Sequence, residues 1–343
     1  MPILANILLE TAKNGVKMAA TDLELGIESY IEANVTESGA VTIPARIFID
    51  IVSNLPAALI DIAVQEGNAK VEISSENVKF EILGLPATDF PIMPAANGDV
   101  LGKIDAALLR TMIRQTSFAV STDETRPFLT GVYMMVNGGI GQLVATDGGR
   151  LALRKSKIPG NIESKLSAII PSKTMAELVR ALGNVEGEVG FASQGNQLIF
   201  ILTGMRFVSR LIAGQFPNYE QVIPKDYKQR IKVGTERLLR AVRRASITAR
   251  DSANVVRLTA SENTLTISSN TPDIGKAQED IQVQTEGDAI PVAFNAKFLL
   301  DALSNMDAAE VFFDLTGSLS PGALRPVDRD DYVYVLAPVR VYG

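Results

Sequence analysis

Two acidic pairs are the residues of this chain whose types could perform general acid–base or metal chemistry. Asp22 lies two residues before Glu24, and Asp123 is followed directly by Glu124. The first pair lies near a predicted turn and the second precedes a Thr-Arg-Pro sequence, so turn and surface charge explain both pairs better than catalysis does. No nucleophile lies in a pattern that pairs it with a base. We therefore expect that the protein is not an enzyme. The alternative, a hydrolase that uses these carboxylates, would be supported only by an observation of metal-dependent turnover.

A glycine-rich stretch at 137–141 is the second candidate for chemistry. No Gly-Lys-Ser/Thr follows it and no helical pattern opens after it, so it fits neither a phosphate-binding loop nor a dinucleotide fingerprint. It is typical of a hairpin turn.

Composition narrows the possible functions further. The 343 residues contain neither His nor Cys, which excludes a His general base, a His-ligated metal, a disulfide and a thiolate metal site. We expect no cofactor. Hydrophobic residues make up 46% and charged residues 21% of the chain, which is typical of a globular protein of two or three domains. The start lacks a basic region and is predicted to be a strand, and no apolar run is long enough to span a membrane. We expect a cytoplasmic protein.

Cationic helix faces are the strongest local signal. The helical patterns near 104–118 and 231–248 carry Arg on one side and apolar residues on the other. Solvated helix faces would explain any one of them. The net charge is −6, so the gathering of Arg on one set of helices favours a surface for a polyanion. No aromatic residue is interleaved, which favours sequence-independent contact with duplex phosphates. The predicted DNA-facing residues are Arg46, Arg110, Arg114, Lys173, Arg180, Arg237, Arg240, Arg244 and Lys297.

The chain also repeats itself. Residues 41–56, 168–183 and 291–306 each predict a strand, a short break and an amphipathic helix. A basic residue stands at one aligned place, and an acid follows four residues later, so each pair can meet on one helix face. The pairs are Arg46 with Asp50, Lys173 with Glu177, and Lys297 with Asp301.

The spacing of other motifs extends the repeat. Pro2 precedes Asp22 by the same interval that separates Pro127 from Asp147, and both acids lie in Ala-Thr-Asp. Alternating apolar segments between the helices predict antiparallel hairpins. We predict an α+β chain of three units, at about 1–98, 99–226 and 227–343, with two helices and antiparallel sheets in each complete unit. The first unit lacks the opening strand and helix of the others.

Seven segments resemble the bacterial DNA polymerase III beta subunit family, the beta sliding clamps. They run in order along essentially the whole chain: 125–132, 145–153, 170–178, 211–224, 269–277, 294–303 and 332–340. The resemblance implies three copies of one domain, with two head-to-tail protomers forming a ring around duplex DNA. It implies a non-enzymatic processivity factor that a clamp-loader ATPase opens, and that tethers the replicative polymerase and other proteins carrying a clamp-binding motif.

The resemblance also implies a peptide-binding cleft between the second and third domains. Apolar wall would come from Leu129, Leu151, Val222, Val335 and Leu336, while Arg150 and Arg340 would bond the peptide's polar groups. The other matching positions are Thr146, Gly148, Pro217, Pro338 and Val339.

Ring closure in the family joins the first domain of one protomer to the third domain of the other through edge strands. The matching positions on the first-domain side are Lys79, Phe80 and Ile82. On the third-domain side they are Ile247, Asp273 and Glu279, and Lys79 is expected to face these acids.

Three departures from the family pattern alter these expectations. Gly149 stands where the family usually has His, and Ala337 stands where it commonly has Met, so we expect a weaker grip on peptide. The family's opening strand and pore-facing helix, which precede the segment at Pro2, are missing, so we expect a less stable first domain. A peptide-binding scaffold that does not close a ring is the alternative function. A clamp of the trimeric kind is disfavoured because three units per chain complete six domains as a dimer.

Overall fold

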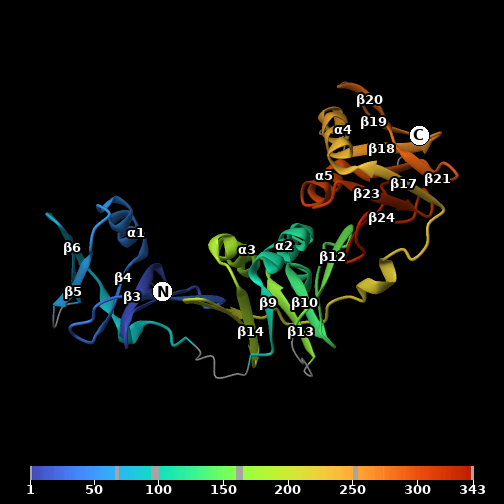
Figure 1. Cartoon of the computed structure of the whole chain (residues 1–343). Coiled ribbons are helices and arrows are strands. Elements are labelled where there is room, and N and C mark those ends of the chain that lie inside the picture. Colours follow the sequence, from blue (N-terminus) through green and yellow to red (C-terminus); the bar gives the residue numbers. More distant parts are fainter. Residues whose placement is uncertain are drawn as a thin grey trace. The chain divides into compact units, whose positions relative to one another are not determined.

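The computed structural model describes residues 2–65, 69–93, 100–159, 165–249, 254–272 and 274–340. The chain divides into two compact units (Figure 1). One unit comprises residues 1–105 and 185–211, and the other comprises residues 106–184 and 212–343. The second predicted repeat is thus shared between the units, because its last three strands continue the sheet of the first repeat.

The first unit is built on one large antiparallel sheet and one small one. Their orders are β8-β4-β1-β2-β3-β16-β15-β14-β9 and β5-β6-β7. The elements are the 3₁₀ turns Pro2–Ala5 and Ala87–Asp89, helix α1 (Ala45–Asn54), and strands β1 (Asn6–Ala12), β2 (Gly15–Thr21), β3 (Leu25–Glu32), β4 (Ala40–Pro44), β5 (Asp61–Gln65), β6 (Lys70–Ser75), β7 (Val78–Leu83), β8 (Leu85–Pro86), β9 (Gly102–Asp105), β14 (Glu188–Gln194), β15 (Gln197–Leu202) and β16 (Met205–Arg210).

The second unit has a nine-stranded and a four-stranded antiparallel sheet with four α-helices in the part of the chain described. The sheet orders are β13-β10-β11-β12-β25-β24-β23-β17-β21 and β20-β19-β18-β22. The helices are α2 (Ala106–Thr116), α3 (Ser172–Ala181), α4 (Thr235–Ala249) and α5 (Ala296–Ser304), and the strands are β10 (Gly131–Asn137), β11 (Ile140–Thr146), β12 (Arg150–Lys157), β13 (Leu166–Pro171), β17 (Gln229–Gly234), β18 (Val255–Ser261), β19 (Thr264–Thr271), β20 (Gly275–Gln282), β21 (Gln284–Gly287), β22 (Val292–Asn295), β23 (Glu310–Leu315), β24 (Gly322–Pro326) and β25 (Tyr332–Leu336).

The element order confirms the predicted repeat. Three strands lead to a short strand and a short helix, and three further strands follow. The short helices α1, α3 and α5 occupy the three segments where the repeat was predicted. In the second and third repeats this series is preceded by a strand and a helix, β9–α2 and β17–α4.

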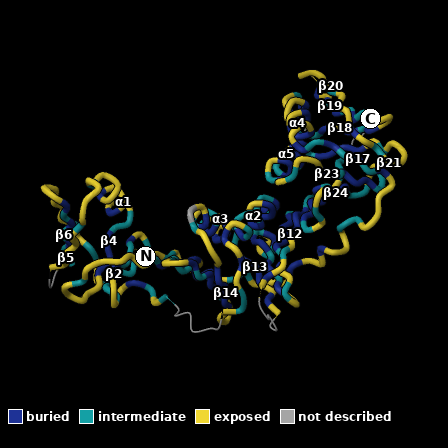
Figure 2. The backbone as a smooth tube through the Cα atoms, in the orientation of Figure 1, coloured by how far each residue is buried: buried dark blue, intermediate teal, exposed yellow. Residues whose placement is uncertain are grey.

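The longer helices are amphipathic, as predicted. Leu109, Met112 and Ile113 of α2 are buried, as are Leu238 and Val242 of α4. The Arg residues of both helices lie on the other side, and Figure 2 shows exposed outer faces on the helices and buried strands beneath. Because an apolar stripe at this spacing must lie against another element, packing on the sheets fixes these helices. α4 packs on β18–β20 and α5, and α2 packs on β11, β12 and α3.

Neighbouring repeats are joined by strand pairing. β3 of the first repeat pairs antiparallel with β16 of the second, and β12 of the second pairs antiparallel with β25 of the third. An ion pair with one buried member lies at each junction: the buried Glu28 binds Arg206, and the buried Arg154 binds Asp331. These pairings hide edges that would otherwise expose unpaired backbone groups.

Of two local predictions of secondary structure, one is confirmed and the other is partly wrong. The hairpin at 137–141 is confirmed, with Gly138 and Gly139 at φ 57° and 75°, the left-handed region that a tight turn between β10 and β11 requires. The predicted opening strand is wrong for residues 2–5, which form a 3₁₀ turn, and the strand begins at Asn6. Within the described ranges, no helix has the length and apolar character needed to cross a membrane.

We predict that the backbone amides of β5 exchange with deuterium faster than those of β23. Every residue of β5 is exposed, and β5 pairs with β6 alone among the described strands, whereas β23 is paired on both sides. Hydrogen-exchange mass spectrometry of the full chain measures both segments together. Equal protection of residues 61–65 and 310–315 would contradict this expectation.

Candidate peptide-binding cleft and nucleic-acid interface

A tight turn at 146–150 forms one rim of the predicted cleft. The Oδ1 atom of Asp147 accepts hydrogen bonds from the backbone N–H groups of Gly149 and Arg150 at 2.8 and 3.0 Å. The Thr146 hydroxyl donates to the Arg150 carbonyl at 2.6 Å, and Gly148 has a φ of 94°. The same bonds recur around Asp22, which accepts from the N–H groups of Glu24 and Leu25. The turn interpretation of the Asp22 pair is therefore confirmed.

The paired strands β12 and β25 form the wall of the cleft. Leu151 lies opposite Val335 in the register, and both are buried. The Ala337 N–H donates to the Gly149 carbonyl at 2.9 Å, so the pairing extends one step past β25. Because the wall is continuous sheet, its apolar side chains are held in a fixed row.

An aromatic group supports the cleft from the segment that follows β16. The rings of Tyr133 and Phe216 stack with centroids 4.8 Å apart and planes 7° from parallel, and Tyr219 packs against both. The Tyr219 hydroxyl donates to Gln142 at 3.1 Å. Burial raises the pKa of Tyr219 to about 12, so this phenol stays neutral and keeps donating at physiological pH.

A cavity of about 220 Å³ lies between these parts, and most of its lining is apolar. Eight of the twelve predicted cleft residues line it, while Leu336, Pro338, Val339 and Arg340 do not. The residues that do are Leu129, Thr146, Gly148, Arg150, Leu151, Pro217, Val222 and Val335. The lining also contains Gly149 and Ala337, the two positions expected to weaken the grip on peptide, and three residues that sequence reasoning missed, namely Asn218, Tyr219 and Pro321. Leu336 is fully buried, and Arg340 is exposed.

Arg150 is held by the protein itself. Its Nε donates to Asp147 at 2.9 Å, its Nη1 to Asp301 at 2.6 Å, and its Nη2 to the Phe118 carbonyl at 2.8 Å. The guanidinium also lies 4.4 Å from the centre of the Phe298 ring. Arg150 thus ties the turn of the second repeat to helix α5 of the third, and the direct contact with peptide predicted for it stays a prediction.

The surroundings of Arg150 favour its charged form. Burial opposes the charged form, but the hydrogen bond with Asp301 and the negative charge of Asp147 outweigh it, so the pKa of Arg150 is raised above its ordinary value. Asp301, the acid predicted to meet Lys297, is committed to this bond. The Asp301 carboxylate therefore helps to join the second repeat to the third.

Gly149 and Ala337, the two small residues that depart from the family pattern, both line the cavity. A Cβ atom on Gly149 would lie 3.3 Å from Cε2 of Phe298, so the aromatic ring occupies space beside this position. Ala337 is exposed and lines the cavity. Phe298, a residue of α5, thus packs beside the rim position Gly149 without lining the cavity itself.

The nine predicted DNA-facing residues all lie on helices α1 to α5. Arg110 is half-buried, and the other eight are exposed: Arg46, Arg114, Lys173, Arg180, Arg237, Arg240, Arg244 and Lys297. Three of these cations are paired with acids, Arg180 with Glu177, Arg240 with Glu236, and Arg244 with Glu279. Paired cations attract phosphates less strongly, which favours weak and diffuse contacts.

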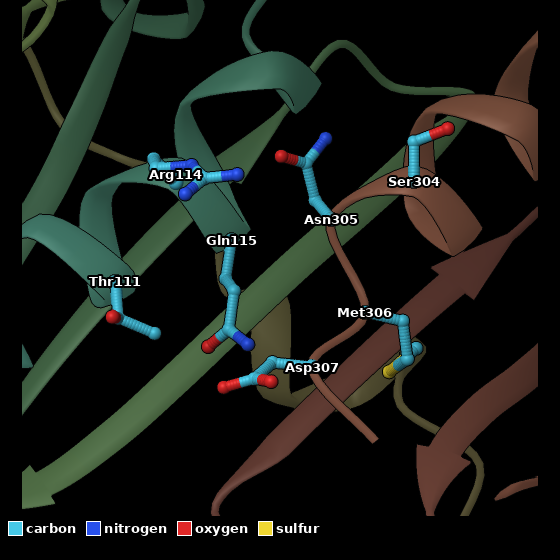
Figure 3. Close-up of a pocket in the computed structure, with 7 residues that line it drawn as sticks. All are labelled: Thr111, Arg114, Gln115, Ser304, Asn305, Met306 and Asp307. Atoms are coloured by element: carbon cyan, nitrogen blue, oxygen red, sulfur yellow. The ribbon is translucent and has the colours of Figure 1, made fainter. Parts of the chain in front are cut away.

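A polar hollow lies beside Arg114, between the end of α2 and the end of α5 (Figure 3). It measures about 310 Å³ and is lined by Thr111, Arg114, Gln115 and residues 304–307. The Gln115 amide is buried and has no hydrogen-bond partner among the described residues. The size and polarity of the hollow suit ordered water.

Four of the six predicted interface residues lie on strands at sheet edges: Lys79, Phe80 and Ile82 on β7, and Glu279 on β20. Lys79 binds Glu72 at 2.7 Å, and Ile247 is 59% exposed on α4. Asp273 lies outside the described residues.

The bond between Arg244 and Glu279 brings a predicted DNA-facing residue and a predicted interface residue together. Two charged hydrogen bonds of 2.7 and 2.5 Å join them. The bond lowers the pKa of Glu279 and raises that of Arg244. Within the described ranges, no group of three acidic side chains could hold a metal ion.

Comparison with known proteins matches this architecture along the whole chain. Models of the N-terminal, central and C-terminal domains of the DNA polymerase III beta subunit match residues 1–94, 103–218 and 220–340. The beta sliding clamps of Staphylococcus aureus and Staphylococcus epidermidis are 31% and 32% identical over 352 aligned residues, which cover 100% of this chain and 93% of each relative.

Solved structures agree. The sliding clamp of Bacillus subtilis is 36% identical with a TM-score of 0.94, covering 100% of this chain and 93% of that one. A sliding clamp of Pseudomonas aeruginosa is 33% identical with a TM-score of 0.93, covering 99% and 93%. A fold of three repeated α+β domains with this cleft defines a sliding clamp. The chain belongs to the DNA polymerase III beta subunit family, whose members are non-enzymatic processivity factors of DNA replication.

We predict that Arg150→Ala lowers the free energy of unfolding by about 3 kcal/mol, because it leaves Asp147 and Asp301 without their buried partner. Arg180→Ala is the matched control. Arg180 is 76% exposed and its pair with Glu177 is a surface pair, so its loss costs under about 1 kcal/mol. Urea denaturation of the two variants gives both values. Similar midpoints for both would show that Arg150 does not hold the repeats together.

Proposed function

We propose that two copies of this chain close head to tail into a ring that encircles duplex DNA and slides along it. The ring tethers the replicative polymerase through the cleft, which raises the polymerase's effective concentration at the primer end. A clamp-loader ATPase opens the ring. Membership of the sliding-clamp family supports this function, and the arrangement of the sheets supports the closure.

The observation that carries the closure is the repeated pairing of equivalent strands. The third strand of the first repeat, β3, pairs with the last strand of the second, β16, and β12 pairs likewise with β25. The third strand of the third repeat is β20. In the first repeat, the third strand after the short helix is β7, as β16 and β25 are in the second and third repeats. β20 and β7 both lie at sheet edges within the described part of the chain. Pairing β20 with β7 of a second copy continues the series and completes a ring of six domains.

The helix faces suit a sliding contact. Exposed cations on α1 to α5 can touch phosphates without reading bases, and several are offset by nearby acids. Such contacts bind weakly, depend on salt and impose no sequence. A closed ring stays on DNA because it encircles the duplex, so it does not need tighter binding to the phosphates.

The cleft suits a short apolar peptide. Leu129, Leu151 and Val335 offer apolar wall, and the exposed Val222 stands at the rim. Partners with a clamp-binding motif would insert apolar side chains here, as short recognition peptides do in apolar grooves.

Domain limits at about 98 and 226 and a cytoplasmic, nucleoid-associated location complete the proposal. The three family models match residues 1–94, 103–218 and 220–340, and this division into three supports limits in these regions. A chain that kept the cleft without closing a ring would be a peptide-binding scaffold, and the two experiments below separate this alternative from a clamp.

We predict that the protein in solution has a mass of about 74 kDa, twice the 36.8 kDa of one chain, and that the mass persists on dilution. Phe80→Asp should shift it to the single-chain value, because a carboxylate on β7 would be buried at the closure. Ile31→Asp on β3, also an exposed apolar residue, serves as control and should remain dimeric. Light scattering after gel filtration reports the mass, and a single-chain mass for the unaltered protein would favour the scaffold.

We predict that Val222→Asp weakens binding of a clamp-binding peptide at least about tenfold, since it places a charge at the apolar rim. Val222 is 49% exposed, so the change should leave folding intact. Ile140→Asp, at a position 46% exposed on β11 and outside the cleft lining, is the matched control. Fluorescence anisotropy with a labelled peptide measures both. Equal loss in both variants would argue against this cleft.

A further inference from the structure

One row of paired residues crosses five strands of the nine-stranded sheet in the second unit. Strand by strand, the row runs through Leu151, Val335, Ala323, Asp314 and Arg230. Residues that lie opposite each other in an antiparallel sheet project from the same face. Leu151 and Val335 line the peptide cleft at one end of the row. The cleft and Arg230 therefore share one face of a continuous sheet.

The segment that follows β16 crosses this face and divides it. Tyr219 and Ala323, the middle residue of the row, belong to one apolar cluster, and Ile223 packs against that cluster. Val222 lines the cleft, whereas Ile223 and Pro224 line a separate open hollow of about 460 Å³, which we call the arginine hollow. The crossing segment is thus the shared border of the cleft and the arginine hollow.

Two arginines meet one buried carboxylate in the arginine hollow. Both oxygens of Asp314 accept hydrogen bonds from Arg230, at 2.6 and 2.8 Å. The Nε atom of Arg325 lies 3.5 Å from Oδ2 of the same carboxylate, and its Nη2 donates to the Pro224 carbonyl at 2.8 Å. One negative charge therefore faces two guanidinium groups, and Arg230 already uses both of its oxygens.

The surroundings hold the two guanidinium groups in place and leave Arg325 short of negative charge. The Arg230 guanidinium lies 4.0 Å from the centre of the Tyr227 ring and 4.4 Å from that of Phe312, so its position is fixed on three sides. Burial, together with the charge of Arg230, lowers the pKa of Arg325, although Asp314 opposes this shift. A further carboxylate beside Arg325 would stabilise its charged form.

The other charges at this place do not supply that carboxylate. Lys225 and Asp226 line the hollow and are both exposed, so their charges offset each other. Glu286 does not line the hollow and accepts a hydrogen bond from the Tyr227 hydroxyl at 3.0 Å. Among the described residues, the lining contains three cations and two acids, which leaves room for one more negative charge.

We propose that the arginine hollow binds a carboxylate of the partner peptide, carried by an acidic residue that flanks the apolar residues held in the cleft. The inference rests on the proposed peptide cleft and extends it across the crossing segment. Val335 and Asp314 lie two strands apart, which is about 10 Å, so at least about three extended residues separate the apolar anchor from the acid. Arg325 and Lys225 supply the positive charge, while Arg230 stays bound to Asp314.

The test compares labelled clamp-binding peptides that differ only in a flanking tail. One version carries a flexible spacer of about four residues and a pair of Asp at its N-terminal end, another carries them at its C-terminal end, and matched versions carry Asn in place of Asp. Fluorescence anisotropy with the full chain gives each affinity. We expect one Asp tail to tighten binding at least about fivefold relative to its Asn version. The gain is diagnostic because the net charge of −6 on the chain disfavours an acidic tail elsewhere.

Variants of the protein locate the gain. Arg325→Gln removes a charge and keeps a side-chain N–H group, so it should abolish the advantage of the Asp tail while binding of the Asn version stays unchanged. Lys225→Gln, at an exposed position, should reduce the advantage. Arg257→Gln changes an exposed arginine of β18 outside the linings of the hollow and the cleft, and as the matched control should retain it.

The outcomes separate this inference from the function on which it rests. Binding of the Asn versions with no gain from either Asp tail would overturn the carboxylate site and leave the cleft intact. An equal gain in Arg325→Gln and in Arg257→Gln would also overturn it. Failure of every peptide to bind the unaltered protein would overturn the proposed cleft and the carboxylate site with it.

Discussion

Strand pairing between successive repeats is the interaction on which the rest of the structure depends. A clamp domain whose sheets end in open edges is an aggregation hazard, and each junction removes two such edges at once. β3 with β16 and β12 with β25 do so within the chain, each with an ion pair beside it that has one buried member. The same pairing builds the cleft wall, because Leu151 and Val335 face each other across the second junction. Closing a ring from two copies requires two further junctions of this kind, each between β20 of one copy and β7 of the other.

Arg150 shows how that constraint reaches the binding site. Its bonds to Asp147, Asp301 and the Phe118 carbonyl tie the rim turn to a helix of the next repeat. The cleft is therefore formed by residues whose positions depend on the junction being intact. Binding of partner peptides and the integrity of the second and third repeats are thus linked through one buried cation.

The sequence predicted the repeated pattern well and the contacts between repeats poorly. The short helices, the hairpins and the turn at Asp22 follow from local spacing, which is why they could be predicted from the sequence. Asp301 was assigned to Lys297 because spacing shows neighbours on one helix, whereas its bond to Arg150 joins residues 151 positions apart. Tyr219 and Pro321 line the cavity together although they lie far apart in the sequence, so local spacing could not predict their role either. Residues 2–5 were predicted as strand because their apolar character does not distinguish a strand from a short turn.

Encirclement of DNA is the central claim, and retention on circular DNA tests it most directly. The protein would be loaded by a clamp loader and ATP onto a nicked plasmid, and the DNA-bound fraction would be isolated by gel filtration at a salt concentration that abolishes diffuse phosphate contacts. A closed ring predicts that the protein stays with the circle and is lost when a restriction enzyme linearises it. Equal retention on circular and linear DNA, or none on either, would contradict it.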